Sequence, residues 1–246
     1  MDRMLFLAMS GVKQTLTAQA AAAHNLANTN TTGFRADLAA FRSMPVFGPG
    51  YPTRVYAMTE RPGVDFTHGP VQHTGNELDV AVNGDGWIAV QSPDGAEAYT
   101  RRGDLRLTSN GFLETGAGHP VLGNGGPIAI PPAEKLEIGS DGTISVLPVG
   151  QDANTLAQVE RIKLVNPPFE FLVKGADGLF RLTDGTNALA DANVTVIAGA
   201  LEGSNVNGVH AMVQMITLAR QFELQVQAMH TAEENDAAAA HMMRLS

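Results

Sequence analysis

The chain has 246 residues, a net charge of −9 and no cysteine, so it can bury a substantial core but holds no disulfide, thiolate metal site or cysteine nucleophile. Residues 1–40 carry +1 and residues 206–246 carry −2, which leaves −8 for the middle of the chain. With four lysines and no basic stripe, we expect no nucleic-acid partner, and we expect the acidic middle to face water.

Residues 1–28 are predicted to form one helix. Ala18 and the run Ala20–Ala23 favour a helix and are small enough to let a second helix approach closely. The apolar stripe is narrow, so this helix needs a partner in the same chain or in another. The stripe follows helical spacing through Met1, Leu5, Ala8, Val12, Leu16, Ala23 and Leu26.

The same segment carries neither a complete signal peptide nor a membrane span. Ala18-Gln19-Ala20 resembles a signal-peptide cleavage site, but the only apolar run before it, Met4–Met9, is too short for a signal peptide. We therefore expect no cleaved secretory signal. No apolar run approaches the length of a membrane span, so no membrane insertion is expected.

The stretch from Asn25 to Arg35 is predicted to end this helix. Its Asn and Thr side chains, Asn28 among them, bond to nearby backbone and compete with helical hydrogen bonds. Gly33 can adopt a positive φ just past the helix, and Phe34 offers an apolar anchor beyond it. By itself, this pattern is best explained as an ordinary helix stop.

Residues 36–75 are predicted to form an extended arm or a hairpin. Residues 36–41 are compatible with a brief helix and residues 53–59 with a strand. Many Pro and Gly residues interrupt any longer element.

Residues 76–204 read as β structure. Short apolar segments alternate with turn sequences such as Asn83-Gly84-Asp85-Gly86 and Ser92-Pro93-Asp94-Gly95, and no βαβ rhythm is visible. This spacing predicts an antiparallel sandwich or barrel-like domain. The expected strands are residues 78–82, 87–90, 98–100, 105–107, 112–113, 121–122, 128–130, 136–138, 144–146, 161–165, 178–182 and 194–197.

Residues 206–246 are predicted to form a second helix, capped by Ser204 or Asn205. Its apolar residues repeat in steps of three and four, which indicates a heptad seam that weakens through residues 233–236. An ordinary core helix remains the alternative. The seam comprises Met212, Met215, Ala219, Phe222, Val226 and Met229.

Together these elements predict an α+β fold: an antiparallel β-rich central domain flanked by N- and C-terminal helices that pair in a coiled-coil-like layer. We expect residues 1–35 with 205–246 to form a helical assembly domain. Residues 36–75 would be an arm or hairpin linker, and residues 76–204 a β-rich outer domain. Apolar surface left on the helices would bind copies of the chain or homologues.

No catalytic or metal-binding constellation is visible. The seven histidines show no ligand spacing, the glycine-rich segments lack phosphate-loop spacing, and the carboxylates lie mainly at turns. Trp87 sits in an apolar strand and is expected in the core. We therefore expect no metal, no cofactor and no enzyme activity.

Four ordered motifs resemble those of bacterial flagellar basal-body rod and hook proteins, and the resemblance covers essentially the whole chain. Within the family, Met1-Asp2, residues 42–46 and residues 177–183 resemble the proximal-rod branch, whereas Ile88 stands where the family often has an aromatic residue. The motifs are Asn25–Arg35, Leu78–Trp87, Tyr99–Asp104 with Gly118–Gly123, and Leu201–Val206.

This resemblance implies a structural subunit of the axial rod that is exported through the flagellar apparatus without cleavage and assembled in the periplasm. Its partners would be copies of itself and other rod proteins. The alternative is a hydrolase or carbohydrate-binding β domain carried on oligomerising helices. The expected assembly residues are Leu5, Val12, Leu16, Asn25, Leu26, Asn28, Gly33 and Phe34, with the six residues of the C-terminal seam.

Overall fold

The computed structural model describes residues 4–39, 41–45, 55–59, 63–148, 150 and 156–244. The fold is α+β, with a helix at each end and antiparallel strands between them, as the sequence predicts. The chain divides into two compact units, and each is described by itself. The helical unit comprises residues 1–29, 36–65 and 206–246, and the β-rich unit comprises residues 30–35 and 66–205.

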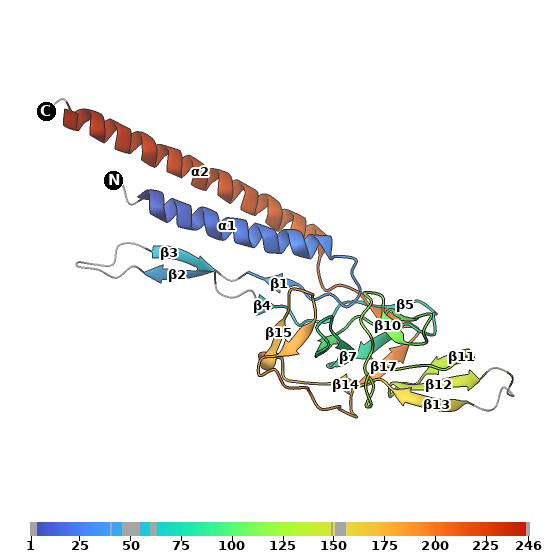
Figure 1. Ribbon diagram of the computed structural model, residues 1–246. Helices are drawn as coiled ribbons and strands as arrows, with labels where there is room; N and C mark the ends of the chain where they lie inside the picture. Colours follow the sequence, from blue (N-terminus) through green and yellow to red (C-terminus); the bar gives the residue numbers. More distant parts are fainter. Residues whose placement is uncertain are drawn as a thin grey trace. The chain divides into compact units, whose positions relative to one another are not determined.

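In the helical unit, two long helices lie side by side and run antiparallel (Figure 1). Helix α1 spans Met4–Ala27, and helix α2 spans Gly208–Arg244. Both predicted terminal helices are confirmed. The start of α1 lies toward the C-terminal end of α2, so residues from the two ends of the chain meet along the pair.

The N-terminus of α2 is capped two or three residues later than predicted. The side-chain oxygen of Asn207 accepts the backbone N–H of His210 at 3.0 Å, and its carbonyl accepts the N–H of Ala211. Asn207 is therefore the capping residue, in place of the predicted Ser204 or Asn205.

Two short antiparallel pairs complete the helical unit. A hairpin of β2 (Phe41–Pro45) and β3 (Val55–Thr59) contacts α1, and β1 (Asp37–Leu38) pairs with β4 (Gly63–Val64). The predicted hairpin and the described part of the predicted strand 53–59 are confirmed. Met1, Asp2, Val46 and Thr53 lie outside the described residues.

The brief helix predicted for residues 36–41 is wrong. The Asn25 carboxamide donates to the carbonyl of Asp37 and accepts its N–H, both at 2.8 Å. The side chain thus satisfies both backbone groups as a neighbouring strand would, which holds Asp37 extended.

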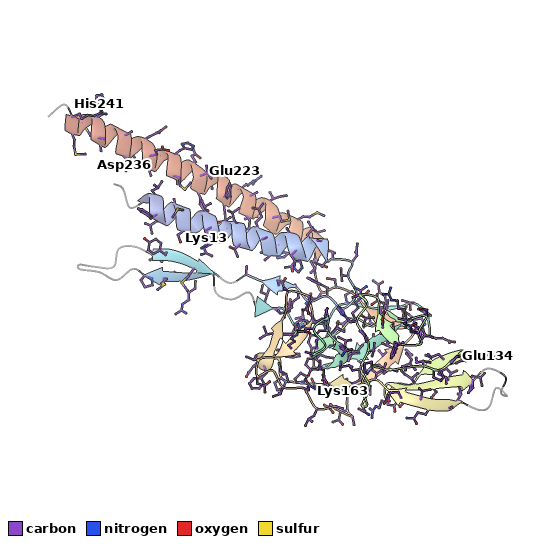
Figure 2. All side chains as sticks on the ribbon, in the orientation of Figure 1. Lys13, Glu134, Lys163, Glu223, Asp236 and His241 are labelled. Carbon is purple, nitrogen blue, oxygen red and sulfur yellow. The ribbon has the colours of Figure 1, made fainter. Side chains whose placement is uncertain are left out.

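The β-rich unit is built around a five-stranded antiparallel sheet in the order β14-β7-β8-β16-β15. Lys163, labelled in Figure 2, lies just before β14, and its ammonium group is 2.8 Å from both carboxylate oxygens of Glu97 on β8. The strands of this sheet are β7 (Trp87–Gln91), β8 (Glu97–Thr100), β14 (Leu164–Val165), β15 (Leu172–Lys174) and β16 (Phe180–Leu182).

Smaller antiparallel sheets surround this one. Strands β5 (Val71–His73), β15 and β18 (Ala200–Glu202) were not predicted, and of β13 (Ala157–Arg161) only the last residue was. A 3₁₀ turn, η1, covers Phe169–Phe171. The sheets pair β18 (Ala200–Glu202) with β5 (Val71–His73), β17 (Thr195–Ala198) with β6 (Val80–Asn83), β10 (Leu113–Thr115) with β9 (Leu105–Leu107), and β12 (Thr143–Pro148) with both β11 (Ala133–Ile138) and β13 (Ala157–Arg161).

The core of the β-rich unit is made of branched aliphatic side chains and a small aromatic group. Trp87 is buried, as the sequence predicts, and its ring centroid lies 4.5 Å from that of Phe180 and 6.2 Å from that of Phe66. Ile88 is fully buried, so an aliphatic side chain at this position fits the core. The unit therefore has a complete core of its own.

Candidate assembly site

The two helices meet through small side chains on α1. Thr15, Ala18 and Ala22 are buried, and the two alanines pack against Leu218 of α2. Small residues let helix backbones approach closely, as the alanine-rich sequence suggests. The larger side chains of the predicted stripe are placed elsewhere: Leu5 and Leu16 remain exposed on α1.

The face of α2 that contacts α1 is offset from the predicted seam. Met215 and Leu218 pack against Ala18 and Ala22 of α1, whereas the predicted Met212 is 54% exposed. The predicted positions 212, 219 and 226 are replaced on this face by positions 211, 218 and 225. The spacing along α2 therefore still alternates between four and three residues. Met215, Leu218 and Gln225 contact α1, and Ala211 and Ala232 are buried at the same spacing. Phe222 and Met229, like the predicted Ala219 and Val226, are partly buried.

Large apolar side chains remain exposed along both helices. They occur on the described parts of α1 and α2 and include several residues of the predicted assembly set. Isolated exposed apolar residues are ordinary, but rows of them along one element mark a contact surface. The exposed residues are Leu5, Phe6, Met9 and Leu16 on α1, and Val209, Met212, Val213, Ile216, Leu224, Met242 and Met243 on α2.

Charged side chains on the helices are sparse. Figure 2 labels Lys13 on α1 and Glu223, Asp236 and His241 on α2. All four are exposed. They keep part of the helix surface hydrated and leave the apolar rows between them.

The predicted assembly residues at the end of α1 bond to or pack against their own chain and do not form an exposed contact surface. Asn25 bonds to Asp37 as described, and the Asn28 carboxamide donates to the carbonyl of His24 at 2.9 Å. Leu26, like Val12 earlier in the helix, is partly buried. These residues therefore shape the end of the helical unit.

Gly33, in the β-rich unit, has the positive φ that the sequence predicts, at +66°. Its N–H donates to the carbonyl of Glu202 at 2.8 Å, and a Cβ added to it would lie 2.4 Å from the backbone carbon of Arg101. Only glycine fits this position, on both conformational and steric grounds. The neighbouring Phe34 ring lies under the Lys174 ammonium group, 4.1 Å from the ring centroid.

A buried charge cluster, comprising Arg35, Arg101 and Glu202, lies next to Gly33. Arg35 donates to Glu202 Oε1 at 2.6 Å, and Arg101 Nη1 lies 3.3 Å from Glu202 Oε2. All three side chains are at most 2% exposed. The Glu202 carboxylate also accepts the backbone N–H of Gly69, so it joins three distant segments of the chain.

Arg101, a member of this cluster, has a shifted pKa. Burial lowers the pKa of Arg101 to about 10 while the Glu202 carboxylate opposes that shift, so Arg101 remains a cation at neutral pH. His68 Nδ1 accepts from Arg101 at 2.9 Å, and its Nε2 lies 3.2 Å from Asp85. Several buried atoms of the two arginines have no hydrogen-bond partner, so loss of the one carboxylate would leave two uncompensated buried cations.

The sequence did not single out this cluster as a site, although each member occurs in one of the quoted motifs. Arg35 ends the first motif, Arg101 lies in the third and Glu202 in the fourth. Sequence alone did not show that residues 167 positions apart would meet.

The rest of the described chain suggests no chemistry. An open hollow of about 530 Å³ lies between Pro167, Pro168 and Leu189, and its carboxylates Asp184 and Asp191 bond to their own turns. In the described residues, no group of His, Asp and Glu side chains has the arrangement of a metal site, and neither helix is apolar enough over its length to cross a membrane.

Three segments of the chain each match a family of flagellar rod or hook proteins. Residues 5–35 match the family described as "Flagella basal body rod protein", residues 81–146 the "Flagellar hook protein FlgE/F/G D1 domain", and residues 197–242 the "Flagellar basal body rod FlgEFG protein C-terminal". The first match ends at Arg35, and the last includes Glu202 and nearly all of α2.

Whole-length relatives agree. The chain is 45% identical to the flagellar basal-body rod protein FlgF of Escherichia coli and 44% identical to that of Salmonella typhimurium, covering all of both proteins in each case. It is 30% identical to the flagellar basal-body rod protein FlgG of Bacillus subtilis over 95% of this chain and 96% of that protein. The chain therefore belongs to the bacterial flagellar basal-body rod protein family, on its FlgF branch, and it is a structural rod subunit and not an enzyme.

Proposed function

We propose that the helical unit is the part of this subunit that assembles, and that it polymerises with copies and with other rod proteins into the axial tube of the proximal rod. The observation that carries this proposal is the row of exposed apolar side chains along α1 and α2. The β-rich unit, by contrast, has a complete core. On this proposal, residues 1–35 with 205–246 act as the assembly domain, and residues 76–204 are carried outside it.

The energetics favour association through this surface. Burying one large aliphatic side chain contributes roughly 1.5–3 kcal/mol, so several together offset the entropy lost when a subunit binds. Leu5, Leu16 and Met212 are exposed and are proposed to contact neighbours directly. Asn25, Asn28, Gly33 and Phe34 are proposed to act indirectly, by holding the chain that follows α1.

The cellular route is also part of the proposal. Family membership supports passage through the flagellar export apparatus and assembly in the periplasm, because a rod subunit has to reach the basal body. A secretion assay for the chain in a strain with a defective export apparatus tests this step. Undiminished export from that strain would contradict it.

The assembly surface is tested by charge substitution on one helix. Ile216→Asp introduces a carboxylate at an exposed apolar position, and Gln214→Asp introduces the same group at an exposed polar position. In a strain that depends on this chain for swimming, Ile216→Asp is expected to abolish motility and incorporation into basal bodies, because a carboxylate cannot be buried unpaired.

The matched variant Gln214→Asp is expected to assemble normally. Both variants are first compared by far-UV circular dichroism, so that loss of the helix itself is recognised. If Ile216→Asp assembles as well as Gln214→Asp, this part of α2 is not an assembly surface.

A further inference from the structure

One polar contact lies inside the seam between α1 and α2. Thr15 is only 3% exposed, and its hydroxyl lies 3.0 Å from the carbonyl of Gly11 and 3.1 Å from Gln225 Oε1. A Cβ added to Gly11 would lie 3.1 Å from Gln225 Nε2, so the missing side chain of Gly11 makes room for the Gln225 carboxamide.

The other side chains along the seam have similar shapes at each heptad, so different registers of the two helices would pack alike. On α1 it is made of Ala18 and Ala22, and on α2 of Ala, Leu, Met and Phe at heptad spacing. The apolar side chains of α2 repeat every seven residues, and the alanines of α1 form a nearly flat surface. A slip of one heptad would therefore again place small side chains of α1 against large side chains of α2. Apolar packing alone therefore discriminates poorly between registers.

We propose that the Thr15–Gln225 contact sets the register of the antiparallel helix pair. A slip of one heptad would move the Gln225 carboxamide from Gly11 and Thr15 to Ala18 and Ala22, which offer no side-chain hydrogen-bond partner. A slip in the other direction would place it against Met4 and Ala8. Each slipped register leaves a polar group in the seam without its partner, which is the way a single polar residue selects register in coiled coils.

This inference goes beyond the proposed function, because it concerns pairing within one chain and not contacts between subunits. A competing cause is also present. Thr29, after the end of α1, lies close to Gly208, at the start of α2: a Cβ added to Gly208 would lie 3.4 Å from the Thr29 methyl group. The N–H of Gly33 donates to the carbonyl of Glu202 and that of Asn205 to the carbonyl of Phe34, so connections near these helix ends are also able to hold the register. The experiment separates the two causes.

The absence of native cysteine allows a direct test by disulfide cross-linking in the isolated chain. The pair Ala22→Cys with Leu218→Cys reports the native register. The pairs Ala18→Cys with Met229→Cys and Ala22→Cys with Ala211→Cys report a slip of one heptad in either direction. Each pair is oxidised in dilute protein, and the intramolecular cross-link is quantified by mass spectrometry.

Each pair is then combined with Thr15→Val and Gln225→Leu, which replace the polar contact by apolar groups of similar size. We expect the yield of a slipped-register cross-link to rise at least about tenfold. The matched control is Thr17→Val with Gln227→Leu, which makes the same changes on exposed parts of the same helices and is expected to leave the yields unchanged.

A slipped-register yield that stays at the level of the parent protein would overturn the proposal and assign the register to the contacts near the end of α1 and the start of α2. Should the double substitution prevent folding, the single variants decide. Thr15→Ser keeps the hydroxyl and is expected to cross-link only in the native register, whereas Thr15→Val is expected to slip. Equal behaviour of these two variants also overturns the proposal. Motility plays no part in this assay, so its outcome is independent of the assembly test.

Discussion

The helical unit and the β-rich unit bury different kinds of side chain. The β-rich unit encloses Trp87, many branched aliphatic residues and a charge cluster. The fully enclosed side chains of α1 are Thr15, Ala18 and Ala22, and larger apolar residues on both helices stay exposed. The β-rich unit therefore has the larger enclosed core, whereas the helical unit encloses few large side chains and leaves rows of large apolar residues exposed along its helices.

The two units also have separate spectroscopic signals. The chain has one tryptophan, Trp87, which lies in the β-rich unit, whereas both long helices lie in the helical unit. Tryptophan fluorescence therefore reports on the β-rich unit, and circular dichroism near the helical minimum reports mainly on the helical unit.

The largest effect is expected from Glu202→Gln. The substitution removes the one carboxylate between two buried guanidinium groups, and breaking a buried ion pair in this way costs about 3–5 kcal/mol. Denaturant unfolding followed by Trp87 fluorescence measures the loss. The control is Glu137→Gln, because Glu137 pairs with Lys135 in an exposed salt bridge worth less than about 1 kcal/mol. If both variants lose the same unfolding free energy, the buried charge cluster contributes no more to stability than an exposed salt bridge.

Gly33→Ala is expected to destabilise the β-rich unit by about 2–5 kcal/mol, because it combines a left-handed backbone with a backbone clash. Gly75→Ala is the matched control. Gly75 has a similar φ of +73° but open space around it, so only the conformational cost of about 1–2 kcal/mol applies. The difference between the two unfolding free energies isolates the close approach of Arg101. If both variants lose the same unfolding free energy, the positive φ alone explains why glycine is needed at position 33.

Ala22→Leu tests the close contact of the helices. Ala22 is buried against Leu218, so a larger side chain is expected to cost about 1–3 kcal/mol, measured as a lower thermal midpoint of the helical signal. Ala23→Leu, at the exposed neighbouring position, is expected to change stability by less than about 0.5 kcal/mol. Tryptophan fluorescence is expected to respond to neither. A similar cost for both would show that the helices are not closely packed at this point.

The smallest effect is a pH dependence in the β-rich unit. The bond from Arg181 lowers the pKa of Asp177, so this carboxylate stabilises the fold fully above the unfolded pKa near 4 and loses that contribution as the pH falls through the lower folded value. Because the pair is partly exposed, the contribution is below about 1 kcal/mol. Asp177→Asn is expected to lower stability more at pH 6 than at pH 2. An equal loss at both values would contradict the assigned cause.

Local features were predictable because local chemistry causes them. The alanine-rich and heptad segments form helices, Gly33 takes its positive φ, and Trp87 lies in an apolar strand of the core. The prediction of a brief helix at residues 36–41 was wrong because a contact from outside this segment determines its conformation. Its backbone is held extended by Asn25, which lies 12 positions before Asp37.

The sequence by itself therefore determined the helical ends, the antiparallel middle and the family. The tertiary structure alone decided which face of α2 meets α1, because two overlapping heptad patterns exist and hydrophobicity favours the one containing Met212 and Val226. The small surface of α1 selects the other, which contains Leu218 and Gln225. The charge cluster likewise depends on contacts between segments far apart in the chain, and periodicity carries no information about which distant residues meet.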